Sequence, residues 1–196
     1  NCALTPGQLL QFYIALVCLS LAVATALLIG GVGLWSNSQL ESTAHRAEDY
    51  GVAIQNEMQA DMQHDNTRGL VEKYVSAVRE NNTELIAEAA KEIKIATAIL
   101  KESFLKNGNS EIFSENSRML HAKALPLVQD YIKTAEAIAN MTGFENAEVE
   151  QVRANFNSKF RLLEKELGAF NDSLNEDIKE TKARATETVT STYTFL

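Results

Sequence analysis

The sequence predicts an all-α protein: an up-down-up-down antiparallel four-helix bundle with long first and fourth helices, preceded by one transmembrane helix. Three observations lead to this fold class. The 196 residues include only two prolines and nine glycines, so long segments lack helix breakers. Apolar residues recur every three or four positions, as one face of a helix requires. Every Asp, Glu, Lys and Arg lies at or after Glu41, so an uncharged segment precedes a polar one.

Residues 8–35 are predicted to form the transmembrane helix. The stretch 12–29 is almost entirely apolar, and with its flanks it can cross a hydrocarbon core of roughly 30 Å at about 1.5 Å per residue. Phe12 near one end and Trp35 at the other suit the two membrane interfaces. A cleaved signal peptide is the main alternative, but no Lys or Arg precedes this stretch, which exceeds the usual ~7–15 residues.

The segment 36–190 is predicted to fold as the bundle. Turn and cap residues at 81–83, 107–110 and 142–143 divide it. The expected helices cover 36–80, 83–105, 112–142 and 145–192.

Apolar stripes indicate which side of each helix faces the core. In the second helix the stripe runs from Leu85 to Leu100, and in the third from Phe113 to Ile138. The fourth helix alternates steps of three and four most regularly, as in a coiled coil or an antiparallel bundle. Its stripe consists of Val149, Val152, Phe156, Phe160, Leu163, Leu167, Phe170, Leu174, Asp177, Thr181, Ala185 and Thr188.

The two outer helices are predicted to be longer than the inner pair and to extend toward the membrane. The uncharged, aromatic residues 191–196 then read as the start of a truncated second transmembrane helix. On this interpretation the chain is an extracytoplasmic loop between two membrane spans, cut at both ends.

A polar interruption occurs in the first bundle helix at 61–68. The stripe through Gly51 and Ile54 would place Asp61, Asp65 and Arg68 on the core-facing line, whereas the apolar residues after this stretch resume about one position later. We therefore expect the buried face to rotate here, as at a stutter in a coiled coil.

The polar residues of this interruption are candidate ligand contacts. The candidates are His64, Asp65 and Arg68, which lie within one turn of a helix. Counting residues from both ends of the long helices places Arg68 near the level of 156–160, so Asn157 and Lys159 complete the predicted site. Arg68 has two alternative roles, as a partner for a ligand carboxylate or as a structural ion pair with Asp65.

Several segments resemble the N-terminal part of bacterial methyl-accepting chemotaxis proteins. They are IGGVGLWSNSQL (29–40), MQHDNTRGLV (62–71), LPLVQDYIKTAEAIA (125–139) and FNSKFRLLEKELGAFNDSL (156–174). The resemblance implies a homodimeric receptor in the bacterial inner membrane whose four-helix bundle faces the periplasm. Such a bundle senses a small molecule or a ligand-carrying periplasmic binding protein, and it signals to a cytoplasmic region in chemotaxis.

Other functions remain alternatives to a chemoreceptor. A sensor histidine kinase or a cyclic-dinucleotide enzyme can carry a similar input domain, and a passive bundle can simply hold protein partners. The net charge of −8 makes nucleic acid an unexpected partner.

Catalytic signatures are missing from the sequence. It has three histidines, no Glu-x-x-His pair, no phosphate-binding loop, no Gly-x-Ser-x-Gly turn and, after Cys18, no cysteine. We therefore predict that the chain is not an enzyme, with no catalytic residue, no metal site and no cofactor.

Overall fold

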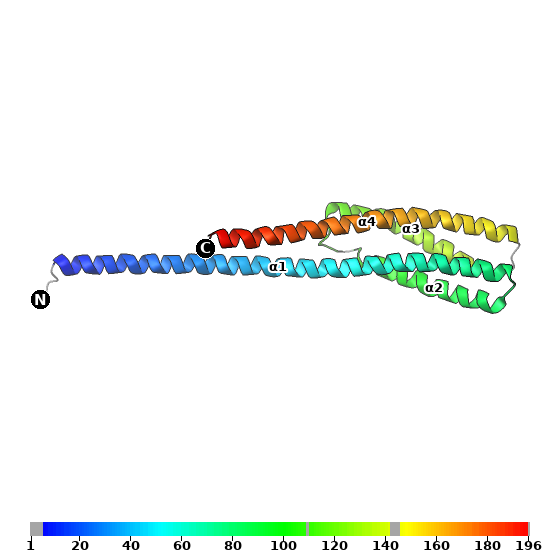
Figure 1. Ribbon diagram of the computed structural model, residues 1–196, viewed down its shortest axis with the longest axis horizontal. Helices are drawn as coiled ribbons and strands as arrows, with labels where there is room; N and C mark the ends of the chain where they lie inside the picture. Colours follow the sequence, from blue (N-terminus) through cyan, green and yellow to red (C-terminus); the bar gives the residue numbers. More distant parts are fainter. Residues whose placement is uncertain (1–5, 109, 142–145, 196) are drawn as a thin grey trace. The chain divides into compact units, whose positions relative to one another are not determined.

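The protein is all-helical in the part that the computed structural model describes, residues 6–108, 110–141 and 146–195. This part contains four α-helices and no β-strand (Figure 1). The helices are α1 (Pro6–Arg79), α2 (Thr83–Lys106), α3 (Glu115–Ala139) and α4 (Asn146–Phe195). The predicted all-α class is therefore confirmed.

The chain divides into two compact units, which are described separately. One comprises Asn1–His45 and Thr181–Leu196, and the other comprises Arg46–Glu180. In the first unit α1 carries the apolar stretch. Among the described residues it is the one helix long and apolar enough to cross a membrane, and none of its most apolar window is buried. No helix end separates residues 35 and 36, because α1 continues through them.

The unit Arg46–Glu180 is a helical bundle whose helix ends follow the cap residues. The side chain of Asn82 accepts a hydrogen bond from the Leu85 amide at 3.1 Å and starts α2, as predicted. Ser114 caps α3 by accepting from the Ser117 amide at 3.1 Å, so that helix begins at residue 115 and not at 112. It ends at residue 139, with Asn140 as its C-cap, and the predicted turn at 142–143 lies outside the described residues.

Hydrogen bonds and ion pairs join the helices of this unit. Residues late in α1 contact residues early in α4: Arg79 pairs with Glu150, and Glu72 pairs with Arg153 at 3.3 Å. The buried Asn107, just after α2, is also tied to α1. Its amide group donates to the Ala53 carbonyl at 2.9 Å.

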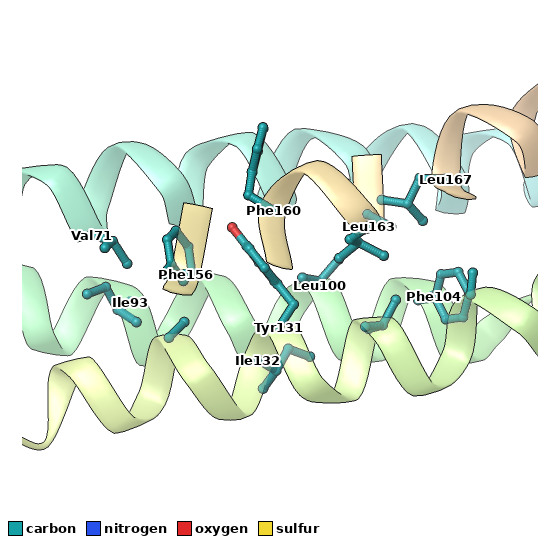
Figure 2. Close-up of a cluster of buried hydrophobic side chains, with 14 of the residues drawn as sticks. Val71, Ile93, Leu100, Phe104, Tyr131, Ile132, Phe156, Phe160, Leu163 and Leu167 are labelled. Carbon is teal, nitrogen blue, oxygen red and sulfur yellow. The ribbon is translucent and has the colours of Figure 1, made fainter. Parts of the chain in front are cut away.

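A hydrophobic core runs through the bundle and receives residues from all four helices (Figure 2). Most of the stripes predicted for the second, third and fourth helices lie in it. Their buried apolar members are Ala89, Ile93, Ala96, Leu100, Phe113, Ala124, Val128, Tyr131, Ala135, Ile138, Val149, Phe156, Phe160, Leu163, Leu167, Phe170 and Leu174.

The core-facing line of α1 differs from the prediction by one position. Its buried seam follows in alternating steps of three and four without a break: Tyr50, Ala53, Glu57, Ala60, His64, Thr67, Val71, Tyr74 and Val78, with Val75 and Ala77 buried beside it. Asp61, Asp65 and Arg68 are exposed, and so is Met62. The predicted rotation of the buried face is therefore wrong. Three positions of the regular seam are polar, Glu57, His64 and Thr67, so the spacing of apolar residues alone does not identify the seam.

Candidate functional site

His64 is fully buried between α1 and α4, at the centre of the predicted site. Its ring stacks on Phe160 with centroids 4.2 Å apart and planes 4° apart. Its Nε2 lies 3.2 Å from the Phe160 carbonyl oxygen, to which it donates in the neutral ring. The Tyr131 hydroxyl of α3 donates to the His64 carbonyl at 2.8 Å. His64 thus links three helices.

The surroundings of His64 keep its ring neutral. Burial lowers its pKa to about 4, and the Arg68 charge acts in the same direction. The Phe160 carbonyl and Asp65 oppose this shift only in part. At neutral pH the imidazole therefore carries no charge for an anionic ligand, and its role in the bundle is packing and hydrogen bonding.

Arg68 lies at the height that residue counting predicted. Its Cζ atom is 4.4 Å from the centroid of the Phe160 ring, so the exposed guanidinium makes a cation–π contact. Among the described residues it forms no ion pair within 4.0 Å, and the expected pair with Asp65 is not present. Of its two predicted roles, the structural ion pair with Asp65 is therefore contradicted.

Asn157 and Lys159 face different neighbours and do not converge on Arg68. The Asn157 amide donates to Glu72 at 3.4 Å, while Lys159 pairs with Asp130 of α3 at 2.5 Å. Asn157 also borders a surface hollow of about 500 Å³, whose lining residues all come from α4. The five predicted residues therefore do not line one common cavity.

A second cavity, which we call the acidic groove, lies between α1 and α4. It encloses about 250 Å³. Four carboxylates line it together with an apolar residue, a glycine and an amide: Glu57, Asp61, Asp65, Glu164, Leu167, Gly168 and Asn171. Asp65 is thus the one predicted site residue that borders this groove.

Glu57 is the most unusual residue of the acidic groove. Its side chain is 2 % exposed, and neither carboxylate oxygen has a hydrogen-bond partner among the described residues. Burial, followed by the charge of Asp61, raises the pKa of Glu57 to about 8. The pKa of Asp61 is also raised, first by burial and then by Asp65 and Glu164. The groove therefore concentrates negative charge without a compensating cation among its lining residues.

Sequence reasoning missed Glu57, although a signal was present. Glu57, Asp61 and Asp65 follow at intervals of four, and like charges at this spacing repel each other on a helix. Glu164 carried no comparable signal, because its place opposite them depends on the register between α1 and α4.

The arrangement is suited to binding. Among the described residues no group of three or more His, Cys, Asp or Glu side chains is placed to hold a metal ion. A groove lined by carboxylates attracts positively charged groups, and a buried carboxyl without a partner can supply one strong interaction to them.

Comparisons with models of protein families, with curated proteins and with solved structures give no match to this chain.

Proposed function

We propose that this chain is the ligand-sensing, extracytoplasmic region of a membrane receptor. It binds a small molecule or a ligand-carrying protein and transmits that event across the membrane to a cytoplasmic signalling region in chemotaxis. The chain itself binds and signals without catalysing a reaction. Its setting is the bacterial inner membrane, with the bundle in the periplasm, as the resemblance to chemotaxis receptors implies.

The observation that carries this proposal is the continuity of α1. One uninterrupted helix, Pro6–Arg79, contains both a stretch able to cross a membrane and the groove residues Glu57, Asp61 and Asp65. A ligand that contacts these carboxylates therefore acts directly on a helix that also reaches the bilayer. Sensing and transmission need this continuity, whereas a passive interaction module does not.

The proposed receptor has an antiparallel up-down-up-down bundle and works as a homodimer. The reversed order of the contacts between α1 and α4 supports the antiparallel arrangement. Val52, Met58 and Met62 on α1 are each more than half exposed, which supports a second copy packing against this helix.

A hybrid receptor tests the signalling role. The 196-residue chain is joined to the second membrane span and cytoplasmic region of an established chemoreceptor, and kinase output is recorded while amino acids, organic acids and amines are added. We expect at least one compound to change the output. The same cytoplasmic region behind its own sensor is the positive control. An output that no compound changes, in membranes where the hybrid is inserted, contradicts the sensor and favours a passive module.

Thiol labelling tests the location of the bundle. Glu111→Cys places a thiol on an exposed position of the α2–α3 connection, in a background where Cys2 and the exposed Cys18 are replaced by serine. We expect a membrane-impermeant maleimide to label this variant in cells whose outer membrane is permeabilised. Labelling that appears only after the inner membrane is broken places the bundle in the cytoplasm and overturns the proposed orientation.

A further inference from the structure

We propose that the acidic groove binds a small organic cation, through an ammonium or guanidinium group that forms an ion pair with Glu57. This assignment names the ligand class of the sensor, and its biological role therefore rests on the proposed function. The binding itself is a property of the groove and can be measured without any signalling output.

The unsatisfied side chain of Glu57 is the first reason to expect a ligand in the groove. Buried polar side chains in folded proteins are nearly always hydrogen-bonded, and a buried carboxyl without a partner is costly. The side chain of Glu57 is only 2 % exposed, and both of its oxygens lack a partner among the described residues. Glu57 is one of the residues that line the acidic groove.

The charges around Glu57 define the sign of that partner. Asp61 and Asp65 follow it on α1, Glu164 faces them from α4, and no Lys or Arg belongs to the lining. Like charges this close disfavour one another's ionised forms, which is consistent with the raised pKa of Asp61. A bound cation relieves this repulsion at several carboxylates simultaneously, while an anion increases it.

The shape of the groove favours an organic cation over a metal ion. No set of three carboxylates among the described residues converges as metal ligands. The volume of about 250 Å³ lies just below the roughly 300–1,000 Å³ of common ligand pockets, so it suits a charged group on a short chain. Gly168 has no side chain, and a Cβ atom placed there meets nothing within 4 Å, which leaves room for aliphatic carbons beside Leu167.

Binding is expected to release a proton. With a pKa of about 8, the Glu57 carboxyl is mostly protonated at pH 7. An ammonium group pairs with the carboxylate form, so the carboxyl O–H bond breaks and its proton passes to the buffer. Affinity therefore rises as the pH increases toward about 8, while the amine remains protonated.

Calorimetry on the whole chain tests the assignment. The 196-residue chain in lipid nanodiscs is titrated at pH 7 with 1,4-diaminobutane, a short aliphatic chain with two ammonium groups. Two buffers with different ionisation enthalpies measure the protons released, and the uncharged 1,4-butanediol is the ligand control. We expect saturable binding of the diamine with release of up to about one proton, and no binding of the diol.

Three variants distinguish binding in the acidic groove from nonspecific attraction of the diamine to surface charge. Glu57→Gln should weaken diamine binding at least about tenfold and remove the proton release, since it deletes a charge-assisted contact. Asp172→Asn is the matched control, because it removes an exposed negative charge of α4 that does not line the groove, and affinity should stay within about twofold. Glu164→Gln should weaken binding by an intermediate factor. If circular dichroism shows that Glu57→Gln does not fold, Glu164→Gln still tests binding in the groove.

Several results would overturn the assignment. They are absence of diamine binding to the wild-type chain, equal weakening by Asp172→Asn and the groove variants, and saturable binding of Mg²⁺ alone at the same carboxylates. A loss of dimer in Glu57→Gln without any amine binding would show that a second copy covers the groove, which also rejects a free cation. Diamine binding with an unresponsive hybrid receptor contradicts only the sensor, whereas a hybrid that responds to other compounds without diamine binding contradicts only the ligand class.

Discussion

Among the described residues three carboxylates are buried, those of Glu57, Glu166 and Asp177, and Glu57 and Asp177 differ most in how they are satisfied. Asp177 of α4 is 8 % exposed, and its Oδ2 accepts hydrogen bonds from the Ser117 hydroxyl at 2.8 Å and the Ser114 amide at 3.1 Å. Ser173 extends this cluster through a 2.8 Å contact with Ser117. Glu57 is even more buried, at 2 % exposed, but it has no partner among the described residues.

The difference separates a structural role from a binding role. Asp177 completes the N-terminal end of α3, where free amide groups and the helix dipole favour a negative charge. Its interactions are therefore used within the fold. Glu57 leaves its hydrogen-bonding capacity unused, so a molecule from outside can supply the missing interactions. Burial alone does not distinguish these two cases, whereas hydrogen-bond satisfaction does.

Asp177→Ala should have the largest effect on stability. The substitution removes the acceptor of the Ser114 amide and a charge-assisted hydrogen bond of the Ser117 hydroxyl, and we expect the free energy of unfolding to fall by about 2–3 kcal/mol. Denaturant unfolding followed by circular dichroism measures this loss. Asp172→Ala on the exposed face of α4 is the control, with an expected change within about 0.5 kcal/mol. Equal effects of the two variants would mean that the Asp177 cluster adds no stability.

Raising the pH should weaken the fold through Glu57. Its pKa is raised from 4.5 to about 8, so between these values the folded state holds a proton that the unfolded state has lost. The free energy of unfolding therefore falls with increasing pH, by up to about 1.4 kcal/mol per pH unit, and levels off above about 8. Unfolding curves of the wild-type chain and Glu57→Gln at pH 6, 7 and 8 measure the slope that Glu57 contributes.

His64 acts in the opposite direction at lower pH. Because burial lowers its pKa from 6.5 to about 4, acidification through this range favours the unfolded state, which binds the proton more readily. The difference between wild-type and Glu57→Gln curves removes this shared contribution. Parallel pH profiles for the two proteins would contradict a buried, protonated Glu57.

Gly168→Ala should have the smallest effect on stability but a specific effect on binding. A methyl group there meets no atom within 4 Å, and alanine is a better helix former than glycine. We expect a gain of about 0.5–1 kcal/mol in the free energy of unfolding. The added methyl group narrows the acidic groove, so diamine binding should weaken.

Gly69→Ala is the matched control for that variant. Gly69 is also an exposed helical glycine with open space around it, but it does not line the groove. It should give a similar gain in stability and unchanged diamine affinity. Equal affinities for the two variants would place the diamine elsewhere on the bundle.

The core positions of α4 could be predicted from the sequence because its seam is mostly apolar. From Val149 to Leu174 the alternation of three and four residues identifies buried positions directly, and Asp177 continues the same line. The α1 seam has the same spacing, but Glu57, His64 and Thr67 occupy it. An apolar pattern then aligns better with exposed residues such as Met62, and the predicted face is displaced by one position.

The candidate site was harder to predict because it depends on the relation between two helices. Height along the bundle could be counted, since all α-helices rise by about 1.5 Å per residue, and Arg68 does lie at Phe160. The direction in which a side chain points depends instead on helix register. Glu57 and Glu164 are more than one hundred residues apart in the chain, and only the packing of α1 on α4 places both in one groove.

Asn107 ties the part of α1 beside the acidic groove to the connection between α2 and α3. Its side chain holds the α2–α3 connection to the Ala53 carbonyl at 2.9 Å and accepts from Asn56 at 3.1 Å, immediately before Glu57 in α1. An axial displacement of α1 must therefore break these two hydrogen bonds or pull the connection with it. Occupancy of the groove would then change the rate at which amide hydrogens of residues 106–108 exchange with solvent.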